Sequence, residues 1–271
     1  MLRSLKELEG YTVGAADGDI GNVGNFLLDD ERWGVRYLVV ESDEFLKGRR
    51  VLISPISFMS ADWSTRRFNL ALTMKKVQNS PDIDLRKPVS RRHEFEYNLY
   101  YGHPHYWGSM EVWGMFNCPN AVASDSGIVE LSEHSDKVSV DGSVDVHLRS
   151  AGEVRGYHIH GSDEAIGHVA DFIVDDETWE VRYLVIDTSN WWFGKKVLVS
   201  PHWASRISWA EKMVYLDMSR QKIQECPEWD ATAVVNREYE RRLYNYYGRP
   251  TYWVGGDHPE DLPSATTRPP G

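Results

Sequence analysis

The chain has 271 residues, of which 41% are hydrophobic and 26% are charged, and its formal net charge is -11. This length is typical of two domains of ordinary size, and no apolar run approaches the roughly 18 residues that a membrane helix needs. Residues 1–107 carry 15 basic and 15 acidic side chains, whereas residues 108–146 carry 1 and 7. The chain therefore lacks the basic stripe that would bind nucleic-acid phosphates or anionic lipid.

The N-terminus and the cysteines indicate the compartment. Residues 1–6 lead into a charged segment without an apolar signal core, and Cys118 and Cys226 stand in unrelated contexts, each next to a proline. These features predict a cytoplasmic protein with no integral membrane segment and no structural disulfide.

An internal repeat organises the chain, because residues of the first half match those 146 positions later without a gap. The match runs from Leu2 with Leu148 to Trp107 with Trp253 and is densest at 33–39. We infer a duplicated unit.

Within the first unit, short apolar runs alternate with turn residues at the spacing of an all-β domain. We expect strands over 11–15, 20–28, 33–40, 49–54 and 67–73. Because both faces of 33–40 are largely apolar, this strand is predicted to be central. Strands this short and twisted bury most apolar surface when they close into a small barrel.

Each unit ends in a charged, Tyr-rich segment, 91–101 in the first and 237–247 in the second. Ser90 and Asn236 are good N-cap residues ahead of these segments, and a glycine and a proline follow each one. The pattern predicts a short helical tail after each barrel.

Several spaced motifs of the unit resemble the PRC-barrel domain family. They are the runs 18–23, 26–31, 33–40 and 49–55, and the resemblance covers about residues 2–80 and 148–226. That fold is shared by the cytoplasmic domain of the photosynthetic reaction-centre H subunit and the C-terminal domain of the ribosome maturation factor. The resemblance implies small barrels, six-stranded or similar, that contact other macromolecules and have no catalytic residues of their own.

This chain departs from both relatives. It lacks the transmembrane anchor of the H subunit and the preceding second barrel domain of the maturation factor, so neither function carries over to particular residues. An accessory role like that of the H subunit, in a photosynthetic or membrane complex, stays open as an alternative.

The predicted fold is mainly β, with two tandem small PRC-type β-barrels that are each followed by a short α-helical tail. We expect these domains: PRC-barrel 1 (1–80), helical tail 1 (81–107), an acidic flexible linker (108–146), PRC-barrel 2 (147–226), helical tail 2 (227–253) and a disordered tail (254–271). A fused pair can replace a homodimer, so we expect the units to pack as a pseudo-dimer or against a second chain, and a homo-oligomer stays possible.

Two groups of residues suggest metal ligands. The acidic triplet 29–31, repeated at 175–177, suits a hard cation, but three consecutive acids between strands fit a charged hairpin turn better than a calcium loop. His158 and His160 share one strand face and suit zinc or copper, yet Thr12 and Gly14 replace them in the first unit. We predict exposed strand histidines, no metal site and no cofactor.

Hydrolytic and nucleotide chemistry lack a residue constellation. Ser54 and Ser200 precede prolines without an equivalent histidine in both units, and the run 18–21 leads into a strand rather than a phosphate-binding helix N-terminus. We therefore predict no catalytic residues and no enzyme activity.

Five residues are candidates for an interaction. Trp191, Trp192 and Phe193 are consecutive large aromatics that cannot all face one core, so this loop is the best candidate contact patch. Arg36 and Arg182 could reach a partner carboxylate, or could bond to loop carbonyls or an acid of their own domain.

The predicted function is macromolecular binding or scaffolding, with a protein partner that the sequence does not identify and with no nucleic acid. The alternative is a small-ligand or metal-binding sensor.

Overall fold

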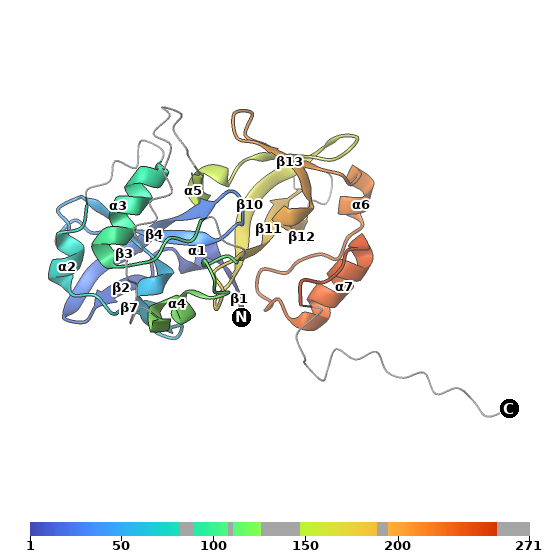
Figure 1. The fold of residues 1–271 in the computed structure, drawn as a ribbon. Helices are drawn as coiled ribbons and strands as arrows, with labels where there is room; N and C mark the ends of the chain where they lie inside the picture. The colour runs from blue at the N-terminus through green and yellow to red at the C-terminus, as the bar shows by residue number, and fades with distance from the viewer. Residues whose placement is uncertain (82–88, 108–110, 126–146, 189–194, 254–271) are drawn as a thin grey trace, which may run out of the picture.

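The computed structural model describes residues 1–81, 89–107, 111–125, 147–188 and 195–253. Within these ranges the chain is mainly β and forms two seven-stranded sheets with short helices around them (Figure 1). No helix in the same ranges is long and apolar enough to cross a bilayer.

Among its described residues, the first half of the chain contains seven strands and five short helices. The strands are β1 (Leu2–Ser4), β2 (Thr12–Ala15), β3 (Gly18–Asp29), β4 (Val35–Glu41), β5 (Arg50–Ile53), β6 (Phe58–Asp62) and β7 (Arg67–Leu70). The helices are α1 (Leu5–Leu8), the 3-10 helix η1 (Pro55–Ser57), α2 (Met74–Gln78), α3 (Arg91–Tyr101) and α4 (Pro119–Asp125). The five strands expected from the sequence fall on β2, β3, β4, β5 and β7.

The second half repeats this order. The strands are β8 (Leu148–Ser150), β9 (His158–His160), β10 (Ala165–Asp175), β11 (Val181–Asp187), β12 (Lys196–Val199), β13 (Ala204–Ser208) and β14 (Met213–Leu216). The helices are α5 (Ala151–Val154), η3 (Pro201–Trp203), α6 (Arg220–Gln224) and α7 (Arg237–Tyr247).

Both sheets have the same topology. The strand order is β5-β4-β3-β2-β7-β6 in the first and β12-β11-β10-β9-β14-β13 in the second. β7 pairs parallel with β2, as β14 does with β9, and the other pairs are antiparallel. The predicted closed barrel is not seen, since no ladder among the described residues joins β5 to β6 or β12 to β13. The chain turns at η1 and η3 there, and each begins with a proline, which cannot donate to a ladder.

Each sheet gains its seventh strand from the other half of the chain. β1 pairs antiparallel with β10, and β8 pairs antiparallel with β3. Leu2 lies opposite Asp175, and Leu148 lies opposite Asp29, so the two contacts are repeats of each other. Figure 1 shows the N-terminus at the junction of the two sheets as a result. The two units hold each other by a reciprocal exchange of first strands.

Two tryptophans extend this junction through their backbones. The carbonyl of Trp179 accepts from the Val35 N–H at 2.7 Å, and the carbonyl of Trp33 accepts from the Val181 N–H at 2.8 Å. Their side chains are buried, and one hydrophobic cluster runs through both units. The Trp179 ring packs on Phe58 of the first unit at 5.3 Å between ring centroids. These repeated tryptophans therefore act in packing between units.

Part of the segment expected to be a flexible linker is structured. Residues 111–125 form a short turn and α4, and Trp113 and Val122 are buried. The Trp113 indole N–H donates to the Thr178 carbonyl of the second unit at 2.6 Å. The expectation of a flexible linker was wrong for residues 111–125, because apolar side chains in this acidic segment pack into the hydrophobic core. Residues 126–146 and the predicted disordered tail 254–271 lie outside the described residues.

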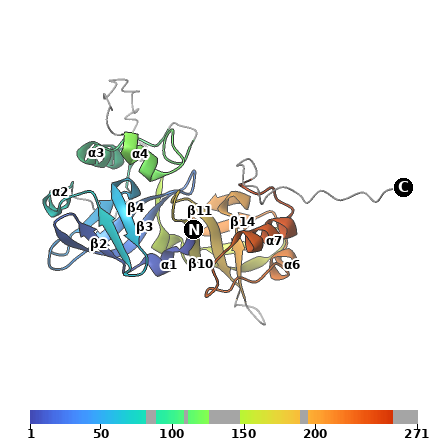
Figure 2. The same cartoon turned by 90° about the horizontal axis from the view of Figure 1, so that it is seen from below.

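The two tail helices occupy the predicted ranges and end at Gly102 and Gly248, whose φ angles of 77° and 67° are left-handed. The Asn236 side chain accepts from the Tyr239 N–H at 2.9 Å, whereas the Ser90 side chain makes no such bond. Figure 2 shows α3 and α4 along one side of the first unit.

α3 is attached to the sheet through Tyr97, whose hydroxyl bonds both the N–H (2.8 Å) and the carbonyl (2.7 Å) of Leu52 on β5. A small second core under the helix includes Tyr37 and Val39 of β4. This packing holds α3 against the first unit, with Arg91 within 3.7 Å of Glu31 in the acidic turn.

Candidate functional site

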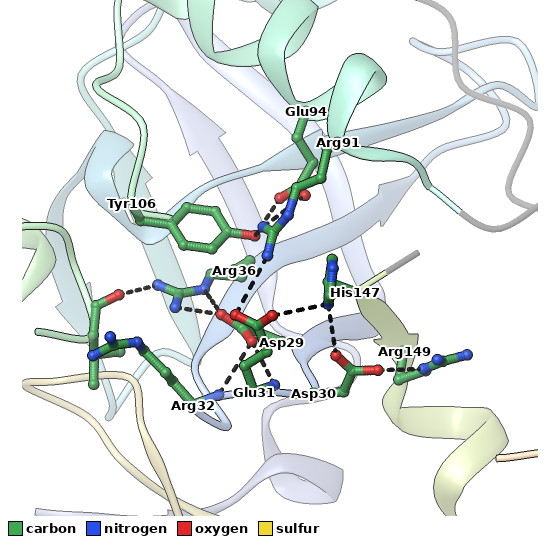
Figure 3. A network of polar contacts seen from close by, with 11 residues as sticks. Asp29, Asp30, Glu31, Arg32, Arg36, Arg91, Glu94, Tyr106, His147 and Arg149 are labelled. Atoms are coloured by element: carbon green, nitrogen blue, oxygen red, sulfur yellow. Dashed lines mark hydrogen bonds and ion pairs between the residues drawn. The ribbon is translucent and has the colours of Figure 1, made fainter. Parts of the chain in front are cut away.

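The acidic turn at the end of β3 lies at the centre of a polar network (Figure 3). Asp29 is 1% exposed. One of its carboxylate oxygens accepts from the backbone N–H groups of Glu31 (2.8 Å) and Arg32 (3.2 Å), which closes the turn. The other accepts from Nε (3.0 Å) and Nη2 (2.6 Å) of Arg36 on β4. The first acid of the triplet is therefore an internal structural group.

Arg36 is buried as deeply as its partner, and the side chains of this ion pair are 0% and 2% exposed. Its guanidinium lies 3.6 Å from the centroid of the Tyr106 ring, and Nη1 donates to the carbonyl of Val112. Arg36 thus joins the acidic turn to the structured part of the segment between the units.

The surroundings of Asp29 fix its charge. Burial alone would raise the pKa of this carboxyl group, but the charge and hydrogen bonds of Arg36, with the two turn N–H groups, outweigh burial and lower the pKa. Asp29 is therefore a carboxylate at neutral pH, and the pair is neutral overall.

The second acid of the triplet points across the junction to the exchanged strand. Asp30 accepts from Nε of Arg149 on β8 at 2.9 Å and lies 3.3 Å from Nδ1 of His147 (Figure 3). The equivalent Asp176 accepts from Nε of Arg3 on β1 at 2.6 Å and from the N-terminal amine. Each acidic turn thus binds the first strand of the other unit, so these carboxylates help to join the two units.

A third layer of the network comes from α3. Glu94 is 1% exposed and accepts from the Tyr106 hydroxyl and from Nη1 of Arg91 at 3.2 Å. Arg91 also donates to the Tyr106 oxygen at 2.8 Å and lies 3.7 Å from Glu31. Burial raises the pKa of Glu94 to about 7, against the opposing effects of Tyr106 and the two arginines. This carboxyl group can change its charge near neutral pH.

In the second unit the equivalent arginine, Arg182, has different partners. Nη1 of Arg182 forms an ion pair at 2.7 Å with Glu180, which replaces Gly34 of the first unit, and both side chains are 14% exposed. The Arg182 guanidinium lies 4.1 Å from the Tyr252 ring centroid. Both predicted arginines therefore bond to acids of their own units.

The remaining sequence candidates have separate positions. The aromatic loop of Trp191, Trp192 and Phe193 lies outside the described residues. His158 is exposed on β9, and Nδ1 of His160 lies 2.6 Å from the Gly161 carbonyl.

An apolar patch on α3 was missed by sequence reasoning. Phe95 and Leu99, one turn apart, are 41% and 53% exposed. The exposed His105 ring stacks on Phe95 at 4.9 Å between centroids. We call Phe95, Leu99 and His105 the α3 patch. The repeat carried a signal for it, because the second unit has polar residues at the equivalent positions: Arg241, Asn245 and Thr251.

The fold and this network define a two-unit β protein in which an acidic turn of each unit binds the first strand of the other. Residues 149–221, which span most of the second unit, match the PRC-barrel domain family. This match agrees with the sequence motifs, which predicted a PRC-barrel over about residues 148–226. No curated protein matches the chain.

Proposed function

We propose that both units are PRC-barrels and that the chain is a non-enzymatic binding or scaffolding protein that recognises another protein. The shared strand order supports the same assignment for the first unit. The carboxylates of the acidic turns are bonded to arginines of the chain, which supports a structural rather than a catalytic use of these groups.

The α3 patch carries this proposal. Exposed apolar side chains at one point of a helix are costly unless a partner covers them. The duplicated helix α7 shows that the fold does not need them, because Arg241 and Asn245 occupy the positions of Phe95 and Leu99. An aromatic and an aliphatic anchor on a rigid helix are typical of a protein-binding surface.

The test transfers the residues of α7 to α3. In affinity capture from the extract of its own cells, the double variant Phe95→Arg, Leu99→Asn should lose a protein partner that the unchanged chain retains. Loss of two apolar anchors typically weakens binding by about 2 kcal/mol or more, which is roughly thirtyfold. Circular dichroism should show the same fold, because the second unit accepts these residues.

A matched control, Arg241→Ala with Asn245→Ala, should keep the partner. A triple variant with Ser at 191–193 tests the aromatic loop as a second contact surface. Equal capture by the unchanged chain and the α3 variant would refute the α3 patch, and capture of no protein by any form would favour a small-ligand function.

A further inference from the structure

The buried acid Glu94 receives fewer hydrogen bonds than its counterpart in the second unit. Its counterpart Glu240 on α7 accepts three hydrogen bonds, from Tyr183 (2.7 Å), Tyr252 (2.9 Å) and Arg237 (3.0 Å). Glu94 accepts from the equivalents of the last two, Tyr106 and Arg91. The first unit thus lacks one hydroxyl donor to this carboxyl group.

A single difference in sequence explains the missing donor. The first unit has Asn98 where the second has Tyr244, and the Tyr37 hydroxyl donates to Oδ1 of Asn98 at 3.2 Å. Tyr183, the equivalent of Tyr37, donates to Glu240 instead. Asn98 therefore diverts a donor from Glu94, while its own Nδ2 has no partner among the described residues.

The positive charges near Glu94 do not compensate for the missing hydroxyl donor. Arg91 on α3 is shared with Tyr106 and Glu31, and Arg36 on β4 is bonded to Asp29. Other titratable groups that act on this carboxyl group, among the described residues, are the hydroxyls of Tyr37 on β4 and Tyr106 after α3 and the carboxylate of Asp29 on β3. Ionised Glu94 is thus buried with one directly bonded cation that it shares, beside an Asp29–Arg36 pair that is neutral overall, which is unfavourable.

We propose that Glu94 is a proton-controlled latch that holds α3 against the first unit more firmly when its carboxyl group carries a proton. Loss of the proton weakens the docking of α3 without releasing α7, which has an additional tyrosine donor. The effect reaches the junction, because the Tyr106 ring covers Arg36 and Arg36 binds the Val112 carbonyl.

The direction follows from linkage. Because the pKa of Glu94 is raised from 4.5 to about 7 when α3 is docked, docking is strongest below pH 4.5 and weakens as pH rises to about 7. Above that value both states are ionised, and the effect of this group is constant.

His103, which follows α3, gives the docking of this helix the opposite pH dependence. Burial lowers the pKa of this imidazole to about 4, so docking is weakened as pH falls below its ordinary value of 6.5. A test must therefore compare proteins that both contain His103, so that its contribution cancels.

Hydrogen exchange of the full chain tests the latch, with the amides of α7 as a reference in the same sample. The variant Glu94→Gln carries a neutral side chain of the same shape and should protect α3 better than the unchanged chain. For local opening, this advantage should grow by about twentyfold between pH 5.5 and 7.5, since the open state ionises first. An advantage that is equal at the two pH values would overturn the proposal.

A second variant separates the latch from simple packing. Asn98→Tyr restores the arrangement of the second unit and frees the Tyr37 hydroxyl to donate to Glu94. A further donor favours the carboxylate, so the pH-dependent gain from Glu94→Gln should shrink in this background. If the pH-dependent gain in protection were as large as in the background without Asn98→Tyr, the number of hydrogen-bond donors would not control the proton affinity of Glu94. If this variant does not fold, the comparison of Glu94→Gln with the unchanged chain decides alone.

Discussion

Replacing Arg36 with Gln is expected to lower the free energy of unfolding by about 3–5 kcal/mol, because it leaves Asp29 as a buried carboxylate without its cation. Both side chains are almost fully buried, so water cannot take over the role of the guanidinium. The substitution also removes the bond to the Val112 carbonyl and the contact with the Tyr106 ring. Urea unfolding at pH 7, followed by tryptophan fluorescence, measures the loss.

The duplicated arginine provides a matched control. Arg182→Gln should cost about 1 kcal/mol, because Arg182 and Glu180 both keep contact with solvent and Glu180 can be hydrated. The double variant Asp29→Asn, Arg36→Gln removes both charges and should lose less than the sum of its single variants by about 2 kcal/mol. Equal losses for Arg36→Gln and Arg182→Gln would contradict this account of the buried pair.

The local pattern of the sequence was sufficient for five of the seven described strands of the first unit and for the tail helices, but not for β1 and β6. Alternation along 33–40 depends on neighbouring residues only, and β4 lies there. The ranges 91–101 and 237–247 were limited by cap residues and glycines, and α3 and α7 occupy them. The exchange of β1 and β8 could not be predicted in this way, because three residues such as Leu2–Ser4 carry no signal for a partner about 170 positions away.

Charged residues were interpreted less well. The acidic triplet was expected to form a charged hairpin turn, and Glu94 stood in a charged, Tyr-rich segment without being singled out. Whether such a residue is buried depends on a partner from another element, as Arg36 is for Asp29 and Tyr106 is for Glu94. The repeat did contain a hint, since Arg91, Glu94 and Tyr106 recur as a set: Arg237, Glu240 and Tyr252.

The substitution Gly167→Ala is expected to destabilise the second unit by about 3 kcal/mol or more. A Cβ atom at Gly167 would lie 2.1 Å from the backbone oxygen of Asp187 on β11, and that strand cannot move away without breaking its ladders. For a protein of this size the loss corresponds to a fall in the melting temperature of roughly 6–12 °C. Differential scanning calorimetry measures it directly.

The repeat shows why this glycine differs from others. Gly21, its equivalent, would place a Cβ atom 2.3 Å from the backbone oxygen of Glu41, so Gly21→Ala should destabilise the first unit in the same way. Gly152 is the control, because its nearest neighbour is the Asn25 side chain at 3.3 Å and the first unit has Lys6 at the equivalent position. Gly152→Ala should change the melting temperature by about 2 °C or less. If Gly167→Ala changed the melting temperature as little as Gly152→Ala, the close approach of β10 and β11 would not explain the need for glycine at this position.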